Sequence, residues 1–195
     1  MIKSARPFSV IRPFFLLIFI LSFAALPLRA AENAFWSGKV VHVSDGDSFV
    51  VLMEHNGRYE EARVRLAWVD APELDQPYGR SAKRFTSELI AGKKVWIKSL
   101  YRDRYGRIVG EVFTPGGKSL DEELLRAGMA WQYTRYSNSQ RLAALEREAR
   151  ALKKGLWAGP GPIPPWQYRR EHKILRFRRS YRFWQPSPPR MVFPW

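Results

Sequence analysis

Acidic, basic and aromatic side chains that could act on a phosphate ester occur in four short segments of this chain. The segments are Asp45-Gly46-Asp47-Ser48, Arg65 with Asp70-Ala71-Pro72-Glu73, Arg107 within Asp103-Arg104-Tyr105-Gly106-Arg107, and the pair Tyr133 and Tyr136. Carboxylates can hold a hard cation, arginines can bind a phosphate, and tyrosines can stack on a base. Together these residue types indicate metal-assisted chemistry on a phosphodiester.

Each acidic segment has a simpler interpretation when taken alone. Asp45-Gly46-Asp47 is a common hairpin turn, and Asp70-Ala71-Pro72-Glu73 could be an ordinary strand exit. Both segments, however, end strands of one predicted meander, so their carboxylates can face a single pocket. Such a pocket would suit calcium or magnesium, which prefer oxygen ligands.

The two arginines also allow two interpretations. Arg65 could pair with a nearby carboxylate, and Arg107 could be a solvated charge in a turn. Planar guanidinium groups are equally suited to phosphoryl oxygens on which charge develops. The sequence offers no serine–histidine pairing and no cysteine, so an activated water is the expected nucleophile.

Zinc is disfavoured as the metal. The chain has no cysteine, and its three histidines, His42, His55 and His172, lack metal-ligand spacing. The lack of cysteine also excludes a disulfide scaffold.

The elements that must position these residues are mainly strands. Alternating apolar residues and turn signals predict five strands, at residues 39–43, 48–53, 61–66, 94–97 and 108–113. Three helices are predicted at 79–90, from Ser119 to Gly128, and from about 140 to 154. Ser119 and Glu122 form an expected capping box, and Leu142, Leu145, Ala149 and Leu152 the expected apolar face of the third helix. The fold class is therefore α+β, mainly β: a five-stranded oligonucleotide-binding (OB) barrel with about three helices.

Size and charge set the broad class of partner. The 195 residues allow one domain with terminal extensions, and 46% hydrophobic residues support a packed core. The net charge of +15 favours a polyanion: nucleic acid, an anionic membrane surface or an acidic polysaccharide. Charge alone does not choose among these three.

The first 30 residues are predicted to be a signal peptide. Lys3, Arg6 and Arg12 precede an apolar run over 14–26, and Leu28-Arg29-Ala30 resembles a cleavage site. A retained membrane anchor is the alternative, but the run is shorter than the ~20 residues that span a bilayer. We therefore expect export to the periplasm or the extracellular medium, with a mature domain over 31–157.

Residues 158–195 form a tail rich in proline, arginine and aromatic residues, in which Glu171 is the one acid. We expect it to be flexible. It could be a solvated extension, an arm that binds DNA, or a weak contact to a membrane surface.

The order of the motifs resembles that of staphylococcal nuclease-like (thermonuclease) domains over about Val40 to Trp157. The matching segments are Asp45-Gly46-Asp47-Ser48, Arg65-Leu66, Val69-Asp70-Ala71-Pro72-Glu73, Tyr78-Gly79, Asp103-Arg104-Tyr105-Gly106-Arg107, Leu124-Leu125-Arg126-Ala127-Gly128 and Gly155-Leu156-Trp157. Ser48 and Ala71 stand where threonine is common, and Tyr133 is displaced from the position of the family's second tyrosine.

This resemblance implies a role for each site residue. One calcium ion per domain would be bound by the side chains of Asp47 and Asp70 and by the carbonyl of Ala71, with Asp45 ordering water nearby. Arg65 and Arg107 would hold the scissile phosphate and stabilise its transition state. Glu73 would orient or deprotonate the attacking water. Tyr136, and with less exact alignment Tyr133, would contact the substrate.

The expected protein is thus a secreted, calcium-dependent nuclease that hydrolyses DNA and RNA and leaves 3′-phosphates. It is expected to be a monomer without an obligate protein partner. Two alternatives belong to other classes: a non-catalytic nucleic-acid-binding module on the same barrel, and an envelope-associated interaction protein that works through the basic tail.

Overall fold

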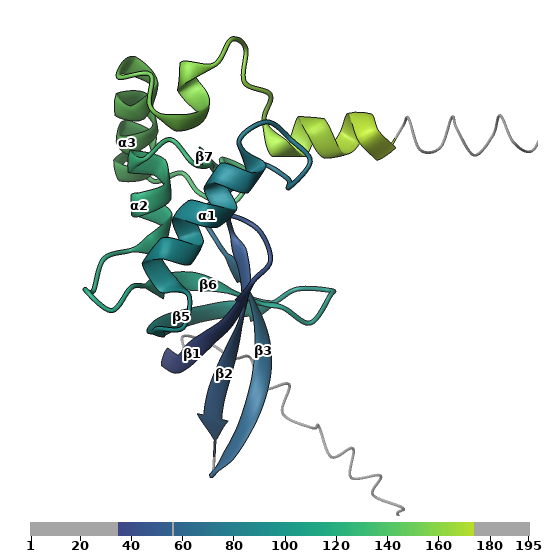
Figure 1. The fold of residues 1–195 in the computed structure, drawn as a ribbon, viewed down its shortest axis with the longest axis vertical. Coiled ribbons are helices and arrows are strands. Elements are labelled where there is room, and N and C mark those ends of the chain that lie inside the picture. Colours follow the sequence, from purple (N-terminus) through teal and green to yellow (C-terminus); the bar gives the residue numbers. More distant parts are fainter. Residues whose placement is uncertain (1–34, 56, 174–195) are drawn as a thin grey trace, which may run out of the picture.

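The computed structural model describes residues 35–55 and 57–173 (Figure 1). The predicted signal peptide and the part of the tail beyond residue 173 lie outside the described residues. Within the described part of the chain, no helix has the length and apolar character needed to cross a membrane.

Five strands close into a barrel, as the sequence predicts. They are β1 (Phe35–Val43), β2 (Ser48–His55), β3 (Arg58–Leu66), β5 (Lys94–Arg102) and β6 (Ile108–Phe113), in the order β1-β2-β3-β6-β5. Neighbouring strands are antiparallel except β3 and β6, which are parallel and pair Arg65 with Val109. The prediction of a five-stranded OB-type barrel is confirmed, and β1, β2, β3 and β5 are longer than predicted.

Alternate residues of these strands fill the barrel. Phe49 and Val51 of β2, Val64 of β3, and Ile97 of β5 are almost completely buried. Burial of each such side chain contributes about 1.5–3 kcal/mol. The strand ends that carry the polar motifs are therefore attached to a rigid apolar core.

Helices gather at one end of the barrel (Figure 1). They are α1 (Gly79–Ile90), α2 (Leu120–Arg126), α3 (Gln140–Ala151) and the 3-10 helix η1 (Gly155–Ala158). α2 is tied to the segment after β3, because the main-chain N–H of Trp68 donates to Oδ1 of the buried Asp121 (3.1 Å).

Two details of the predicted helices are wrong. Ser119 does occupy the N-cap position of α2, but its side chain makes no capping hydrogen bond, and the carboxylate of Glu122 pairs with Arg141 instead. Leu152 is not on a buried face, since α3 ends at Ala151 and the Leu152 side chain is 58% exposed. Lys153, at φ 50°, has turned out of the helical conformation.

A small second sheet joins two distant segments. β4 (Val69–Asp70) pairs antiparallel with β7 (Trp131–Gln132), so that Asp70 lies opposite Trp131. The N–H of Tyr133 then donates to the carbonyl of Trp68 (2.8 Å). This pairing brings the acidic segment and the tyrosine segment side by side.

The chain after η1 returns to the barrel. Residues 159–173, called here the docked segment, include a helix over 165–173 that lies beside the loop before α1 (yellow-green in Figure 1). Nε2 of Gln76 donates to the carbonyl of Ile163 (2.6 Å), and the Tyr168 hydroxyl donates to that of Asp75 (3.2 Å). This part of the tail is packed, which differs from the flexible extension expected from its composition.

Candidate active site

The loop between β1 and β2 places two aspartates at the end of the barrel. Oδ1 of Asp45 accepts the main-chain N–H of Asp47 (3.1 Å), which closes the turn. Gly46 between them is in tight contact: a Cβ there would lie 2.6 Å from the Cβ of Ala71 and 2.8 Å from that of Ala82 in α1. Glycine therefore allows the loop to press against both the acidic segment and α1.

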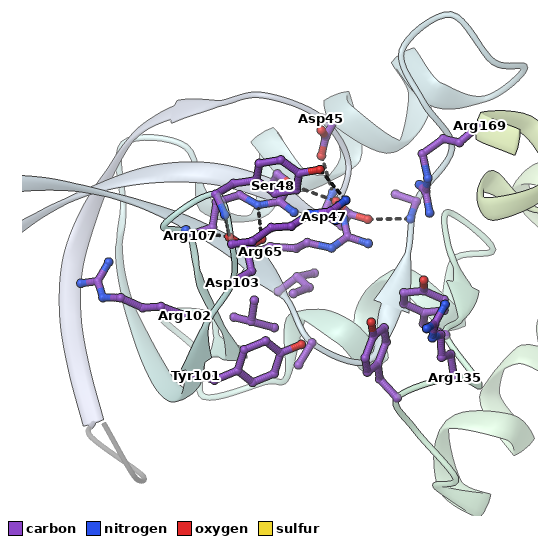
Figure 2. A pocket seen from close by; sticks show the side chains of 18 of the residues that line it. Asp45, Asp47, Ser48, Arg65, Tyr101, Arg102, Asp103, Arg107, Arg135 and Arg169 are labelled. Atoms are coloured by element: carbon purple, nitrogen blue, oxygen red, sulfur yellow. Dashed lines mark hydrogen bonds and ion pairs between the residues drawn. The ribbon is translucent and has the colours of Figure 1, made fainter. Parts of the chain in front are cut away.

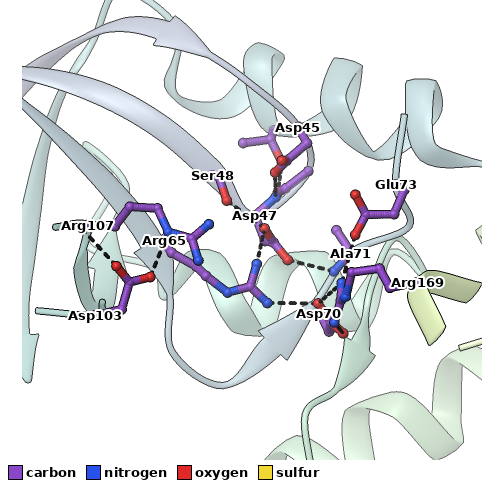
Figure 3. A network of polar contacts seen from close by, with 12 residues as sticks. Asp45, Asp47, Ser48, Arg65, Asp70, Ala71, Glu73, Asp103, Arg107 and Arg169 are labelled. Atoms are coloured by element: carbon purple, nitrogen blue, oxygen red, sulfur yellow. Dashed lines mark hydrogen bonds and ion pairs between the residues drawn. The ribbon is translucent and has the colours of Figure 1, made fainter. Parts of the chain in front are cut away.

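Arg65, near the end of β3, bridges two buried carboxylates. Its Nη1 donates to Oδ1 of Asp47 and its Nη2 to Oδ1 of Asp70, each at 2.7 Å (Figure 3). The Arg65 side chain is itself only 15% exposed. The bridge is possible because β2 and β3 pair Ser48 with Arg65, which brings the strand ends together.

Burial and charge act in opposite directions on the acids of this cluster. Burial raises the pKa of Asp45 to about 7, and the neighbouring charge of Asp47 adds to the effect. For Asp47, burial is outweighed by the positive charge of Arg65 and the hydrogen bond from Ala71, so its pKa is lowered. Burial raises the pKa of Asp70 despite its hydrogen bonds from arginine. Burial thus disfavours the ionised forms of Asp45 and Asp70, whereas Asp47 is stabilised as a carboxylate.

The loop after β4 presents Glu73. The N–H of Ala71 donates to Oδ2 of Asp47 (2.9 Å), and the N–H of Glu73 donates to Oε1 of Gln76 (3.2 Å). Gly79 at the start of α1 makes the loop possible, since a Cβ there would lie 1.8 Å from the carbonyl oxygen of Glu73. The Glu73 side chain stays partly exposed at the edge of the cluster.

Arg107 reaches the same cavity from the turn between β5 and β6. Its Nε donates to Oδ2 of Asp103 (2.8 Å), and its main-chain N–H donates to Oδ1 (3.0 Å). Burial opposes ionisation of Asp103, but the hydrogen bonds from Arg107 dominate and its pKa is lowered. Asp103 therefore stays charged and orients the guanidinium.

Tyr133 and Tyr136 line the cavity on the side of β7. Their rings meet edge to face with centroids 4.9 Å apart. Tyr136 is 49% exposed, whereas the ring of Tyr133 is stacked on Trp166 of the docked segment (5.8 Å, 8° between planes). Tyr136 is thus the more accessible of the two rings.

These groups surround one cavity of about 870 Å³ (Figure 2). Its lining includes six arginines, which are Arg65, Arg102, Arg104, Arg107, Arg135 and Arg169. Asp45, Asp47 and Glu73 line it as well, whereas Asp70 is not part of the lining and pairs with Arg65 and Arg169 (Figure 3). Every predicted site residue except Asp70 therefore lines this cavity.

The donor set fits a hard cation in its chemistry. Carboxylate oxygens and a main-chain carbonyl are the ligands that calcium takes. Among the described residues, no group of three acids is already arranged as a metal site. Arg65 pairs with Asp47 and Asp70, and Arg169 pairs with Asp70, so guanidinium groups supply positive charge to these two acids (Figure 3).

Four polar lining residues, Tyr101, Arg102, Arg135 and Arg169, were missed by the sequence analysis. Tyr101 and Arg102 end β5, and the Arg135 guanidinium lies 5.9 Å from the ring centroid of Tyr136; no motif identifies these three residues. Arg169 was grouped with the basic tail, yet it forms ion pairs with Asp70 and Glu73. In the sequence, Arg169 is marked only by its neighbour Arg170, and a pair of adjacent arginines does not identify a site residue.

Comparison with known proteins gives consistent matches. The family described as staphylococcal nuclease homologue matches residues 63–159. An uncharacterized endonuclease of Escherichia coli is 42% identical over 132 residues, which cover 68% of this chain and 84% of that protein. An uncharacterized endonuclease of Haemophilus influenzae is 37% identical over 136 residues, covering 70% and 74%. A probable staphylococcal-like nuclease of Oryza sativa subsp. japonica is 39% identical over 123 residues, covering 60% of this chain but 37% of the plant protein.

Proposed function

We propose that this chain, which belongs to the staphylococcal nuclease family and is a phosphodiester hydrolase, cleaves both DNA and RNA. The proposed reaction depends on calcium and leaves 3′-phosphates. One observation supports the proposal most directly. The Arg65 guanidinium bridges Asp47 and Asp70 in a cavity that also contains Glu73 and Arg107. Cation ligands, a base and two phosphate-binding groups are thus within one site.

Asp47, Asp70 and the carbonyl of Ala71 would hold the calcium ion, with Asp45 ordering a water beside it. When bound, the ion would offset phosphate charge and favour ionisation of water. The burial of Asp47 and Asp70 strengthens electrostatic attraction in this part of the cavity.

Arg65 and Arg107 bind the phosphoryl oxygens of the scissile group, where negative charge increases in the transition state. Glu73 orients the attacking water or takes its proton. The water oxygen forms a bond to phosphorus while the bond from phosphorus to the 5′-oxygen breaks. The 5′-oxygen leaves as a hydroxyl after protonation from solvent, and the phosphate stays on the 3′ side.

The tyrosines bind the nucleotide next to the cleaved bond. Tyr136 has the accessible ring and stacks on a base, while Tyr133 supports it from the edge. Stacking tolerates any base and either sugar, which supports cleavage of both DNA and RNA.

We also propose that residues 1–30 direct export, so that the enzyme acts in the periplasm or outside the cell. The charged start, the apolar run and Ala30 support this role. The protein is proposed to act as a monomer. Sequencing the N-terminus of the exported protein tests the first point, and a start near Ala31 is expected.

The deciding experiment incubates purified protein with single-stranded DNA and with RNA, in calcium and in excess chelator. Cleavage in calcium, loss of cleavage in chelator, and 3′-phosphate ends on the products are expected. Binding of both polymers without cleavage at any calcium concentration would instead support a non-catalytic binding module. Cleavage that continues in chelator would overturn the role of calcium.

A further inference from the structure

Arg169 of the docked segment makes three hydrogen bonds to two site acids. Its Nη1 donates to Oδ1 of Asp70 (3.1 Å) and to Oε1 of Glu73 (2.8 Å), and its Nη2 donates to Oδ2 of Asp70 (2.7 Å). Figure 3 shows it approaching from the side opposite Arg107. Both oxygens of Asp70 are therefore engaged by this one guanidinium.

The segment is held in place by contacts other than Arg169. Trp166 packs between Trp131 and Tyr133, with ring centroids 5.9 and 5.8 Å away. Gln76 and Tyr168 add the hydrogen bonds described above on either side of the helix start. These contacts aim Arg169 at the cavity independently of its own ion pairs.

The two arginines that contact Asp70 differ in how firmly they are held. Arg65 is part of β3, is largely buried and also pairs with Asp47. Arg169 is 39% exposed and extends from a segment at the mouth of the cavity. Of the two, Arg169 is the one that can withdraw without disturbing the barrel.

We propose that Arg169 is a positioning residue that competes with the divalent cation for Asp70. Its guanidinium holds Asp70 and Glu73 in the calcium-free protein and withdraws from Asp70 when calcium binds. This inference rests on the assignment of Asp70 as a calcium ligand in the proposed function.

Two physical reasons support the competition between Arg169 and calcium. Calcium would need oxygen lone pairs of Asp70 at about 2.3–2.6 Å. Arg65 and Arg169 together use both lone pairs of Oδ1, and Arg169 uses one of the two on Oδ2. A guanidinium and a divalent ion beside the same buried carboxylate also repel each other. Because Arg169 contacts Glu73 as well, its withdrawal frees the group that must orient or deprotonate water.

The coupling acts in both directions. If docking of Arg169 weakens calcium binding by some factor, calcium weakens docking by the same factor. The chain's own C-terminal segment thereby sets the calcium concentration at which the site fills. A purely structural role for Arg169 predicts no such effect.

The test measures calcium binding by titration calorimetry on the full protein and on variants of it. Arg169→Ala is expected to bind calcium at least about fivefold more tightly than the parent. Arg169→Lys should be intermediate, because an ammonium cannot bridge two carboxylates in the same planar manner. Arg170→Ala, a change at the exposed neighbouring residue, is the matched control and should leave affinity unchanged.

Amide hydrogen exchange over 163–173 provides a second readout. Calcium should speed exchange there in the parent protein, while Arg169→Ala should exchange faster already without calcium. Arg169→Gln replaces the alanine variant if thermal melting shows the latter to be unfolded.

Unchanged or weaker calcium binding by the Arg169 variants would overturn the inference. Asp47→Asn separates this result from failure of the proposed function. If Asp47→Asn loses calcium and the Arg169 variants bind it like the parent, only the role of Arg169 is wrong. If the parent binds no calcium, or Asp47→Asn binds it equally well, the metal assignment itself is wrong and the inference falls with it.

Discussion

The guanidinium of Arg65 lies between Asp47 and Asp70 and donates one hydrogen bond of 2.7 Å to each carboxylate. The residue proposed to bind the substrate phosphate is therefore also a counter-charge shared by two buried acids. Its removal should affect stability as well as catalysis.

Arg65→Ala is expected to lower the free energy of unfolding by about 3–5 kcal/mol, because Asp47 and Asp70 lose a buried partner. Calcium should restore part of this loss, since the ion would supply positive charge to the same carboxylates. Urea unfolding with calcium and with chelator measures both effects. Arg58→Ala, at the exposed opposite end of β3, is the control. An equal loss of stability in both conditions would mean that calcium does not bind these acids.

Glu73→Gln should reduce kcat by about two orders of magnitude, because a neutral amide cannot accept the proton of water. Stability should change little, since Glu73 is partly exposed and the amide keeps an acceptor for Arg169. Single-turnover cleavage and thermal unfolding check the two parts. Glu60→Gln, an exposed change on β3, is the matched control and should cleave at the parental rate.

Arg107→Ala should reduce kcat/KM by about 10²–10³, the usual effect of removing a group that stabilises transition-state charge. Asp103→Asn should have a smaller effect, because the amide oxygen can still accept from Nε of Arg107 but no longer offers a negative charge. Steady-state kinetics on a short oligonucleotide distinguish the two. Parental activity in Arg107→Ala would show that this arginine does not contact the phosphate.

The contribution of Asp121 to stability should fall as pH rises from about 4 to 7. Burial raises the pKa of Asp121 from 3.8 to about 7. In this pH range the folded state therefore keeps a proton that the unfolded state has lost, and the free energy of unfolding decreases with pH. Asp121→Asn keeps an acceptor for the N–H of Trp68 but cannot titrate.

The measurement compares the parent with Asp121→Asn by urea unfolding at pH 5 and pH 8. The variant should gain stability relative to the parent as pH rises. Asp45 also has a raised pKa and acts in the same direction, but it is present in both proteins and cancels in the difference. A difference that does not depend on pH would mean that Asp121 is not the titrating group.

The local sequence pattern was sufficient to predict the barrel and most residues of the candidate site. Turn residues and alternation fix where strands such as β2 and β6 lie, and closing the barrel brings their ends together. The acids and arginines at those ends then meet because of topology. For this reason Glu73 and Arg107 line one cavity although they are 34 residues apart in the sequence.

The features that the sequence could not indicate are contacts between residues far apart in the chain. Glu122 fits a capping box, but Arg141 of α3 offers it a stronger, charged partner. The composition of the docked segment is typical of disorder. The rings of Trp131 and Tyr133 bind Trp166, and the carboxylates of Asp70 and Glu73 bind Arg169. These surfaces exist only after the barrel has folded.

The pairing of β4 with β7 fixes the distance between the acidic segment and the tyrosine segment of the site. Asp70 sits directly opposite Trp131, and a short turn leads from β7 to Tyr136. For a strand whose base stacks on Tyr136, the number of nucleotides between that base and the cleaved bond is then set by a rigid backbone ladder. If Tyr136 binds the base as proposed, lengthening the turn over 133–136 is expected to move the position of the cut along the strand.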